Sequence, residues 1–276
     1  MKAIVLALSA SFTWGLADFF GPLKGRTLGA LRVLFYVQLG GLVVIAAIVA
    51  IRGRGPADSA ALLAIPAAIS GTLGLYAYYR GIAVGAVSIV APIAGISAIV
   101  PVIFGIATGD RPSTWQVLGM TAALAGVFLA SREPGRGGSK FAAGVGLALL
   151  AAVGFGGYFP PMHAAGNADF WWASLIFRMT SASVIFAAVA IRRPMLRVVP
   201  IQFSLLALIG VGDMVGNLFF AAASTSGLVS ITSVLASLYP IVTVVLARLV
   251  LKERVARSQE AGIALTLAGV ALISAG

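Results

Sequence analysis

Residues 71–88 read GTLGLYAYYRGIAVGAVS, and residues 213–230, which lie 142 positions later, read DMVGNLFFAAASTSGLVS. Gly74 in the first stretch aligns with Gly216 in the second, and Ser88 aligns with Ser230. At an offset of 143, residues 109–131 (GDRPSTWQVLGMTAALAGVFLAS) align with residues 252–274 (KERVARSQEAGIALTLAGVALIS). One half of the chain therefore repeats the other, and duplication of an apolar unit is typical of membrane transporters.

The composition is that of a multi-pass membrane protein. Of the 276 residues, 60% are hydrophobic and only 10% are charged, and the mean hydropathy is +1.05. Soluble domains carry about 25% charged residues, so a soluble fold does not fit this chain. The net charge of +11 comes mostly from short loops, which indicates membrane orientation rather than nucleic-acid binding. Because the chain has no cysteine, disulfides, thiol catalysis and thiolate metal sites are excluded.

Ten transmembrane helices are predicted, because roughly 20 residues are needed for each crossing. We place them at about 3–22, 30–51, 60–80, 86–108, 114–131, 142–160, 171–191, 203–223, 229–250 and 259–275. Each half holds five spans, an odd number, so the second half must be inverted relative to the first. The predicted fold is an all-α integral membrane protein of two inverted five-helix repeats. Its domains are residues 1–132 (first repeat), 133–141 (linker) and 142–276 (second repeat).

The chain resembles the drug/metabolite transporter superfamily, in its ten-helix branch with two EamA domains. The resemblance rests on the five-plus-five duplication, on Trp14-Gly15 near the end of the first span, and on the charged elements GDRPSTWQVLG and KERVARSQEAG, each followed by LAGV. It implies a secondary transporter of small, often amino acid-like metabolites in the cytoplasmic (inner) membrane, driven by proton exchange or a solute gradient. It also implies a central cavity lined by spans 1, 3, 4, 6, 8 and 9, with spans 5 and 10 at the periphery.

The membrane orientation has two conflicting indications. With the N-terminus inside, the predicted inside segments hold only four cations, Lys2, Arg52, Arg54 and Arg111. Since cytoplasmic loops carry an excess of Lys and Arg, the charge bias favours both termini outside. The resemblance implies cytoplasmic termini instead. The predicted partners are a small-molecule solute, protons and bilayer lipid; no nucleic acid, cofactor or metal is expected, and a monomer and a homodimer both fit.

Ionisable residues within spans are costly in a bilayer and are the first candidates for a binding site. Asp213 is the only acid near the middle of a predicted span, and Asn217 follows at i+4 on the same helix face. The carboxyl group is expected to bind a substrate amine or carry a proton, or else to form a structural salt bridge with Arg178. Asp18 lies four residues after Trp14 and faces either the cavity or the headgroup region. Arg178 itself is a candidate for binding a substrate carboxylate.

Aromatic side chains form the second group of candidates. Trp14, Tyr76, Tyr79, Tyr158 and Tyr239 are expected to shape a pocket for an amphipathic solute, with Tyr76 and Tyr79 sharing a face at i, i+3. An interfacial aromatic belt is the competing interpretation of such residues.

Two alternatives to a transporter stay open at this point. The first is a non-transporting membrane scaffold, and the polar residues within the spans argue against it because a scaffold does not need them. An intramembrane serine protease would need Ser97 as its nucleophile and His163, the only histidine, as its base.

Overall fold

The computed structural model describes residues 1–84, 90, 93–130, 140–250 and 257–275, which form helices and no strand. In chain order these are α1 (Lys2–Leu28), α2 (Ala30–Arg52), the 3-10 helix η1 (Ser59–Leu63), α3 (Ala64–Val84), the 3-10 helix η2 (Ile96–Ala98), α5 (Ile99–Thr108), α6 (Thr114–Ala130), α7 (Lys140–Arg192), α8 (Pro200–Ser224), α9 (Val229–Ala236), α10 (Tyr239–Val250) and α11 (Arg257–Ala275). Most of the predicted linker 133–141, Ser88 and the second charged element at 252–254 lie outside the described residues.

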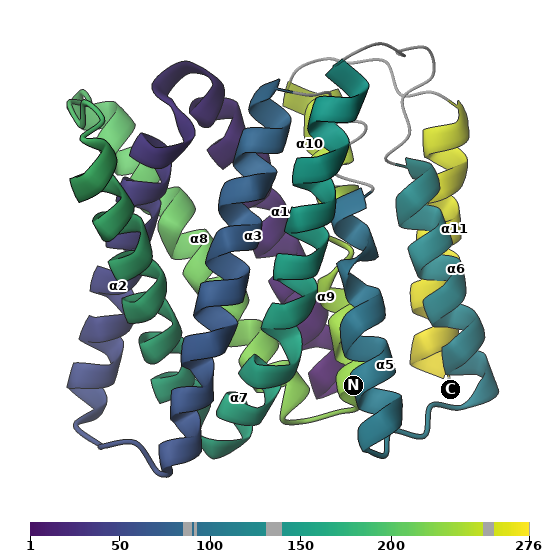
Figure 1. The fold of residues 1–276 in the computed structure, drawn as a ribbon. Coiled ribbons are helices and arrows are strands. Elements are labelled where there is room, and N and C mark those ends of the chain that lie inside the picture. Colours follow the sequence, from purple (N-terminus) through teal and green to yellow (C-terminus); the bar gives the residue numbers. More distant parts are fainter. Residues whose placement is uncertain (85–89, 91–92, 131–139, 251–256, 276) are drawn as a thin grey trace.

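The predicted all-α membrane architecture is confirmed. Five helical segments are long and apolar enough to cross a membrane, and one of them, Gly146–Arg192, has 47 residues. At 1.5 Å per residue that segment is about 70 Å long, enough for two crossings of a ~30 Å hydrocarbon core. Four shorter apolar helices, Ile93–Thr108, Thr114–Leu129, Val229–Thr243 and Glu260–Ile273, match the remaining predicted spans. Both chain ends lie toward the same face of the bundle, as an even number of crossings requires (Figure 1).

The sixth and seventh spans are joined by a break within one helix. The spans placed at 142–160 and 171–191 left the residues between them as a loop, and that prediction is wrong. Helix α7 continues through Pro160 and Pro161 and breaks only at Asp169, whose φ and ψ are −164° and 105°. The Asp169 carboxylate accepts hydrogen bonds from the backbone N–H groups of Trp171 (2.9 Å) and Trp172 (3.2 Å) and so caps the second arm of α7. Within a bilayer a continued helix satisfies backbone groups that a loop would leave unpaired.

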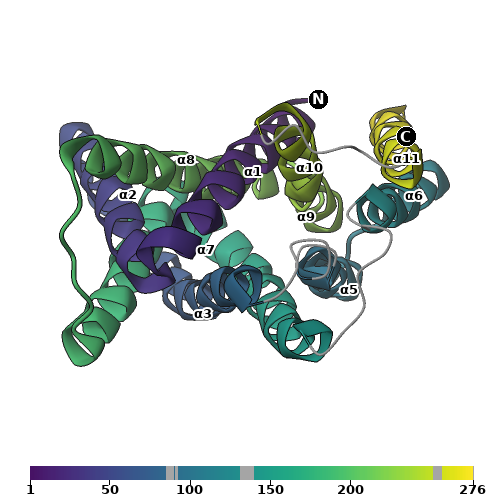
Figure 2. The same ribbon diagram turned by 90° about the horizontal axis from the view of Figure 1, so that it is seen from above.

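Helices α6 and α11 pack against each other at one end of the molecule, and α6 also contacts α9 and α10 (Figure 2). Their contact uses equivalent glycines of the two repeats. A Cβ atom built on Gly126 would lie 2.6 Å from the carbonyl oxygen of Gly262, and one on Gly119 would lie 2.7 Å from that of Gly269. Small residues let helices approach closely in lipid, where hydrophobicity no longer drives association. The peripheral position implied for spans 5 and 10 is therefore confirmed.

The inner helices show the same exchange between repeats. A Cβ atom on Gly154, in the first arm of α7, would lie 2.6 Å from the Cα of Gly74 in α3. At the equivalent place in the other pair, a Cβ on Gly216 of α8 would lie 2.9 Å from the Thr13 Oγ1 of α1. The third helix of each repeat thus packs on the first helix of the other, which is the arrangement expected of inverted repeats.

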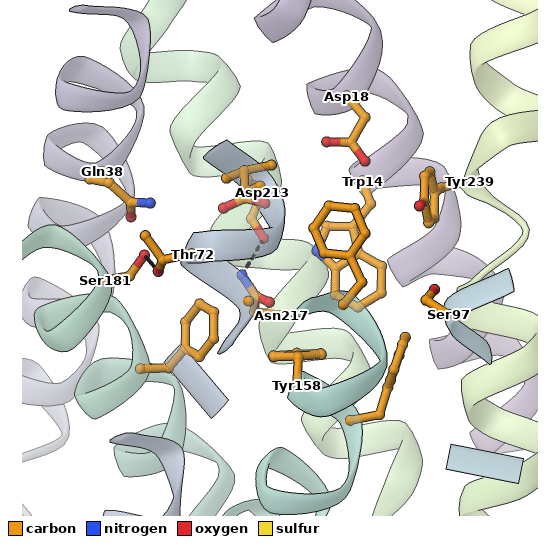
Figure 3. Close-up of a pocket in the computed structure, with 15 residues that line it drawn as sticks. Trp14, Asp18, Gln38, Thr72, Ser97, Tyr158, Ser181, Asp213, Asn217 and Tyr239 are labelled. Carbon is orange, nitrogen blue, oxygen red and sulfur yellow. Dashed lines mark hydrogen bonds between the residues drawn. The ribbon is translucent and has the colours of Figure 1, made fainter. Parts of the chain in front are cut away.

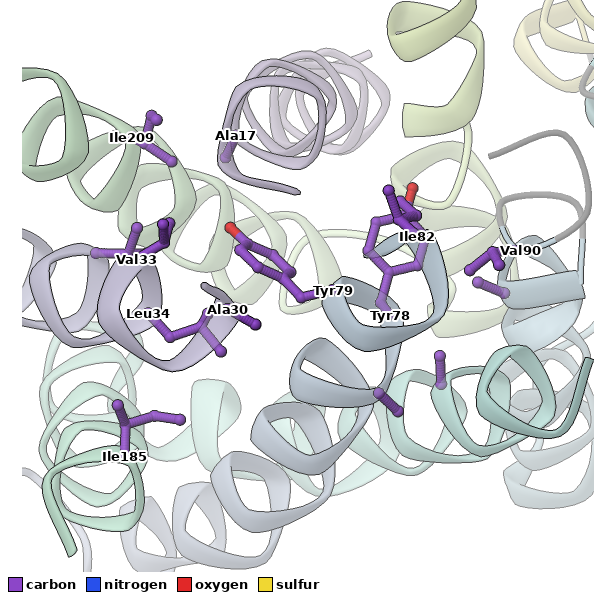
Figure 4. Packing of buried hydrophobic residues seen from close by; sticks show 14 of the residues in the cluster. Ala17, Ala30, Val33, Leu34, Tyr78, Tyr79, Ile82, Val90, Ile185 and Ile209 are labelled. Atoms are coloured by element: carbon purple, nitrogen blue, oxygen red, sulfur yellow. The ribbon is translucent and has the colours of Figure 1, made fainter. Parts of the chain in front are cut away.

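Apolar side chains fill the space between the inner helices at the end of α1. Tyr79 is 3% exposed and packs with Ala17 of α1 and with Val33 and Leu34 of α2 (Figure 4). A different set of apolar residues lies on the outside, for example Val43, Leu149 and Leu208, each more than half exposed. Exposed apolar surface of this extent suits contact with lipid.

Candidate functional site

A cavity lies between the two repeats (Figure 3), and its empty space of about 560 Å³ includes open solvent. The cavity is lined by Trp14, Asp18, Gln38, Gly71, Thr72, Leu75, Ser97, Phe155, Tyr158, Phe159, Phe177, Ser181, Asp213, Asn217 and Tyr239. These residues come from spans 1, 3, 4, 6, 8 and 9, as the resemblance implied, and from spans 2 and 7 in addition.

Two of the lining residues sit where the helices of spans 4 and 9 are irregular. Ser97 is in the 3-10 turn η2 that precedes α5, and Tyr239 is the first residue of α10, after α9 ends at Ala236. Pro240 follows directly and has no backbone N–H to continue the helix of α9. Ser97 and Tyr239 are 142 positions apart, so they are equivalent in the repeat. Interrupted helices near the interface of inverted repeats are where transporters bind their solutes.

Aromatic rings form one wall of the cavity. The Trp14 ring packs edge-on against Tyr158, with centroids 5.9 Å apart, and against Phe159, with centroids 6.3 Å apart. The Tyr158 ring also packs edge-on against Phe177 at 5.3 Å. The indole of Trp14 is held there because Gly216 leaves room for it: a Cβ at Gly216 would lie 2.6 Å from the Trp14 Nε1. These edge-to-face contacts give the wall a rigid shape.

The opposite wall holds a buried ion pair. The Arg178 guanidinium, on the second arm of α7, donates from Nη2 to the Asp213 Oδ2 at 2.6 Å and from Nη1 to the Gln38 Oε1 at 2.6 Å. The Arg178 side chain is 1% exposed, whereas that of Asp213 is 14% exposed. Gly41 makes space for the guanidinium, since a Cβ there would lie 3.1 Å from the Arg178 Cζ. The salt bridge between Asp213 and Arg178 was one of the two predicted interpretations, and the structure contains it.

Two further polar contacts hold the cavity lining in place. Asn217 donates from Nδ2 to the backbone carbonyl of Asp213 at 3.0 Å, which leaves its side-chain oxygen available. The hydroxyls of Thr72 and Ser181 share a hydrogen bond of 2.6 Å that joins α3 to the second arm of α7.

Asp18 is a second carboxylate in the cavity and has no hydrogen-bond or ion-pair partner among the described residues. It is 8% exposed. Because Asp18 is one of the residues that line the cavity, its side chain faces the cavity. Three buried hydroxyls that also line the cavity, those of Ser97, Tyr158 and Tyr239, likewise lack a hydrogen-bond partner.

Six of the nine predicted site residues line the cavity: Trp14, Asp18, Tyr158, Asp213, Asn217 and Tyr239. Arg178 lies behind the lining and acts on it through Asp213 and Gln38. The structure places Tyr76 and Tyr79 outside the cavity. Tyr76 is 39% exposed and Tyr79 is packed in the core, so neither tyrosine contributes to the cavity wall as predicted.

The lining also includes residues that were not predicted from the sequence, among them Gln38, Phe155 and Phe177. Gln38 carries a signal that could have found it, because it is a single polar residue in the apolar stretch VLFYVQLGGLVV. The two phenylalanines carry none, because nothing in the sequence distinguishes them from the other phenylalanines of the spans.

The pair of residues required by the protease interpretation is not brought together. Ser97 lines the cavity, whereas His163 does not, and the His163 ring nitrogen Nε2 lies 3.2 Å from the Asn167 Nδ2.

Comparison with known proteins agrees with the geometry. A crystal structure of another protein has a TM-score of 0.77 to this chain, covering 99% of this chain and 95% of the other, at 18% sequence identity. At that identity the match shows a shared fold. No curated protein matches the chain. The sequence pattern of the EamA-like transporter family matches residues 1–132 and again residues 142–275. The chain therefore belongs to the EamA-like transporter family, within the drug/metabolite transporter superfamily, and contains two EamA domains.

Proposed function

We propose that this membrane transporter is a secondary active transporter that moves a small amphipathic or amino acid-like metabolite across the cytoplasmic membrane by alternating access. The observation that carries the proposal is the cavity between the repeats, which combines an aromatic wall with buried polar groups. Buried polar residues are costly within a membrane and suit a solute pathway better than a scaffold. Residues 1–132 and 142–276 would be the two units that rock around this cavity.

A pair of tyrosine variants tests whether solute passes through the cavity. Tyr239→Phe removes a buried, unpartnered hydroxyl from the lining, whereas Tyr76→Phe makes the same chemical change on the outside of α3. We expect proteoliposomes with Tyr239→Phe to lose several-fold in counterflow of a solute found by a thermal-shift screen, since one hydrogen bond contributes about 0.5–1.5 kcal/mol. Tyr76→Phe should retain the parent rate. Equal rates for the two variants would refute transport through this cavity.

Alternating access can be tested by thiol labelling, because the natural chain contains no cysteine. Ser97→Cys places a single thiol in the cavity lining. In membranes of known orientation, a membrane-impermeant maleimide should reach this thiol from either side, and excess solute should slow the reaction. A thiol that reacts from only one side under opposite solute gradients would contradict alternating access.

Proton coupling through Asp213 is part of the proposal. Protonation of Asp213 would remove the anionic partner of Arg178 and so weaken the link between α8 and the second arm of α7. The test is uptake driven by a pH gradient, compared between the parent and Asp213→Asn. If the variant keeps the pH dependence of the parent, Asp213 does not carry the proton.

A further inference from the structure

We propose that the cavity selects a solute that carries a net positive charge, an organic ammonium with an aromatic or other apolar body, and that Asp18 is its counter-ion. This inference rests on the proposed transport function, because it names the class of solute that the cavity would carry.

The charge of the cavity favours a cationic solute. Two carboxylates line it, those of Asp18 and Asp213, and no Lys, Arg or His is among its lining residues. The cation Arg178, which lies behind the lining, is taken up by Asp213 and Gln38. The lining residues together with Arg178 therefore carry two acids and one base. An ionised carboxylate that is buried without a partner is very unfavourable, so a cation that enters the cavity gains from pairing with Asp18.

The position of Asp18 next to the aromatic wall favours a solute with an apolar body beside its ammonium group. Trp14 lies one turn before Asp18 on the same face of α1, and both line the cavity (Figure 3). The rings of Tyr158 and Phe159 pack against Trp14 at 5.9 and 6.3 Å. An ammonium group next to Asp18 would lie close to the indole, whose face attracts cations. The apolar body of the solute would contact the remaining rings.

The cavity lining also offers hydrogen-bond acceptors for the N–H groups of an ammonium ion. An ammonium group has up to three N–H donors, and the buried hydroxyl oxygens of Ser97, Tyr158 and Tyr239 have no hydrogen-bond partner in the described part of the chain. Asn217 adds a side-chain oxygen, because its amide nitrogen is bonded to the Asp213 carbonyl. A solute carboxylate would find no free cation among the lining residues. It would also be repelled by Asp18.

Three related probes separate the charge classes in a calorimetric titration of the purified full-length protein. Phenylalanine has both an ammonium and a carboxylate group; 2-phenylethylamine lacks the carboxylate, and 3-phenylpropionate lacks the ammonium group. We expect 2-phenylethylamine, as its cation, to bind most tightly. Titration to about 10 mM would detect even an interaction of roughly −2.7 kcal/mol. Binding of phenylalanine or 3-phenylpropionate as tight as that of 2-phenylethylamine, or no binding of 2-phenylethylamine, overturns the inference.

Variants then assign the selectivity to Asp18. Asp18→Asn should weaken 2-phenylethylamine binding on the order of 30-fold or more, because the buried counter-ion is lost. The matched control is Asp58→Asn, the same change at an exposed loop acid that caps η1, and it should keep the parent affinity. Asp18→Glu, which retains the charge, should keep the preference for the ammonium probe if the asparagine variant fails to fold. Unchanged affinity in Asp18→Asn refutes the role of Asp18.

Flux of the same probes into proteoliposomes distinguishes failure of this inference from failure of the proposed function. Transport of 3-phenylpropionate or phenylalanine without transport of 2-phenylethylamine would keep the transporter and overturn the ammonium selectivity. Tight, Asp18-dependent binding of 2-phenylethylamine without flux would support the selectivity and contradict the transport function.

Discussion

The ion pair between Arg178 and Asp213 offers the most direct test of the structure. Arg178→Met keeps an unbranched side chain of similar reach but removes a guanidinium that is fully buried and bonded to both Asp213 and Gln38. Breaking a buried pair from one side costs about 3–5 kcal/mol, because the remaining charge is left unpaired. Since 14% of the Asp213 side chain is exposed in the cavity, water can solvate part of that charge. We therefore expect the lower end of the range, about 3 kcal/mol.

The double variant Arg178→Met/Asp213→Leu should be less destabilised than Arg178→Met, because it leaves no unpaired charge. It removes both charges and leaves only the side-chain oxygen of Gln38 without its partner, at a cost of about 1–3 kcal/mol. The control is Arg54→Met, which changes an exposed arginine that has no ion pair among the described residues and should stay within about 0.5 kcal/mol of the parent. Reversible unfolding by SDS in mixed micelles, followed by circular dichroism, measures the parent, the single variants Arg178→Met and Asp213→Leu, the double variant and the control. Additive effects of the two single variants, with no coupling between them, would refute the pair.

Two smaller perturbations test the packing of the repeats, by the same unfolding measurement. Gly126→Ala should destabilise the protein by about 1–3 kcal/mol, because a Cβ there would lie 2.6 Å from the backbone oxygen of Gly262. The control Gly146→Ala, in open space on α7, should be neutral or stabilising by up to about 1 kcal/mol. Equal effects of the two variants would contradict the close contact of α6 and α11. Ser230→Ala removes the hydroxyl that donates to the Asp110 carboxylate at 2.6 Å and should cost about 1.5–3 kcal/mol, whereas Ser204→Ala, on the exposed start of α8, should cost less than about 0.5 kcal/mol.

The isolated charges of the spans predicted which acids line the cavity. Asp213 and Asp18 were identified because an ionisable residue within a bilayer needs a partner or a function, and both line the cavity. The same rule applied to Arg178 gave the partner of Asp213. It would also have given Gln38, had it been extended to uncharged polar residues.

The tyrosines of α3 show what helix periodicity does not determine. Gly71, Thr72 and Leu75 line the cavity, so the cavity covers little more than one turn of α3. Tyr79 lies one turn beyond Leu75 on the same side of the helix, but at that level Ala17, Val33 and Leu34 fill the space. Spacing at i, i+3 or i+4 gives a face of the helix. How far a cavity extends along that face depends on the neighbouring helices.

The asymmetry between the repeats explains where the polar groups of the cavity lie. Gly71 and Leu75 of α3 are equivalent to Asp213 and Asn217 of α8, and all four residues line the cavity. The inverted repeat thus presents two matching helix surfaces to the same space, and the second carries the acid and the amide. The first is kept small and apolar.

A symmetric pair of acids at these two positions would place another carboxylate in a cavity that has one adjacent arginine. Because that arginine already serves Asp213 and Gln38, a carboxylate at position 71 would be unpaired. Divergence of the two copies thus leaves Asp18 as the cavity carboxylate without a partner among the described residues. Positions of the repeat that differ in polarity and meet across the axis are consequently better guides to such a site than positions that agree.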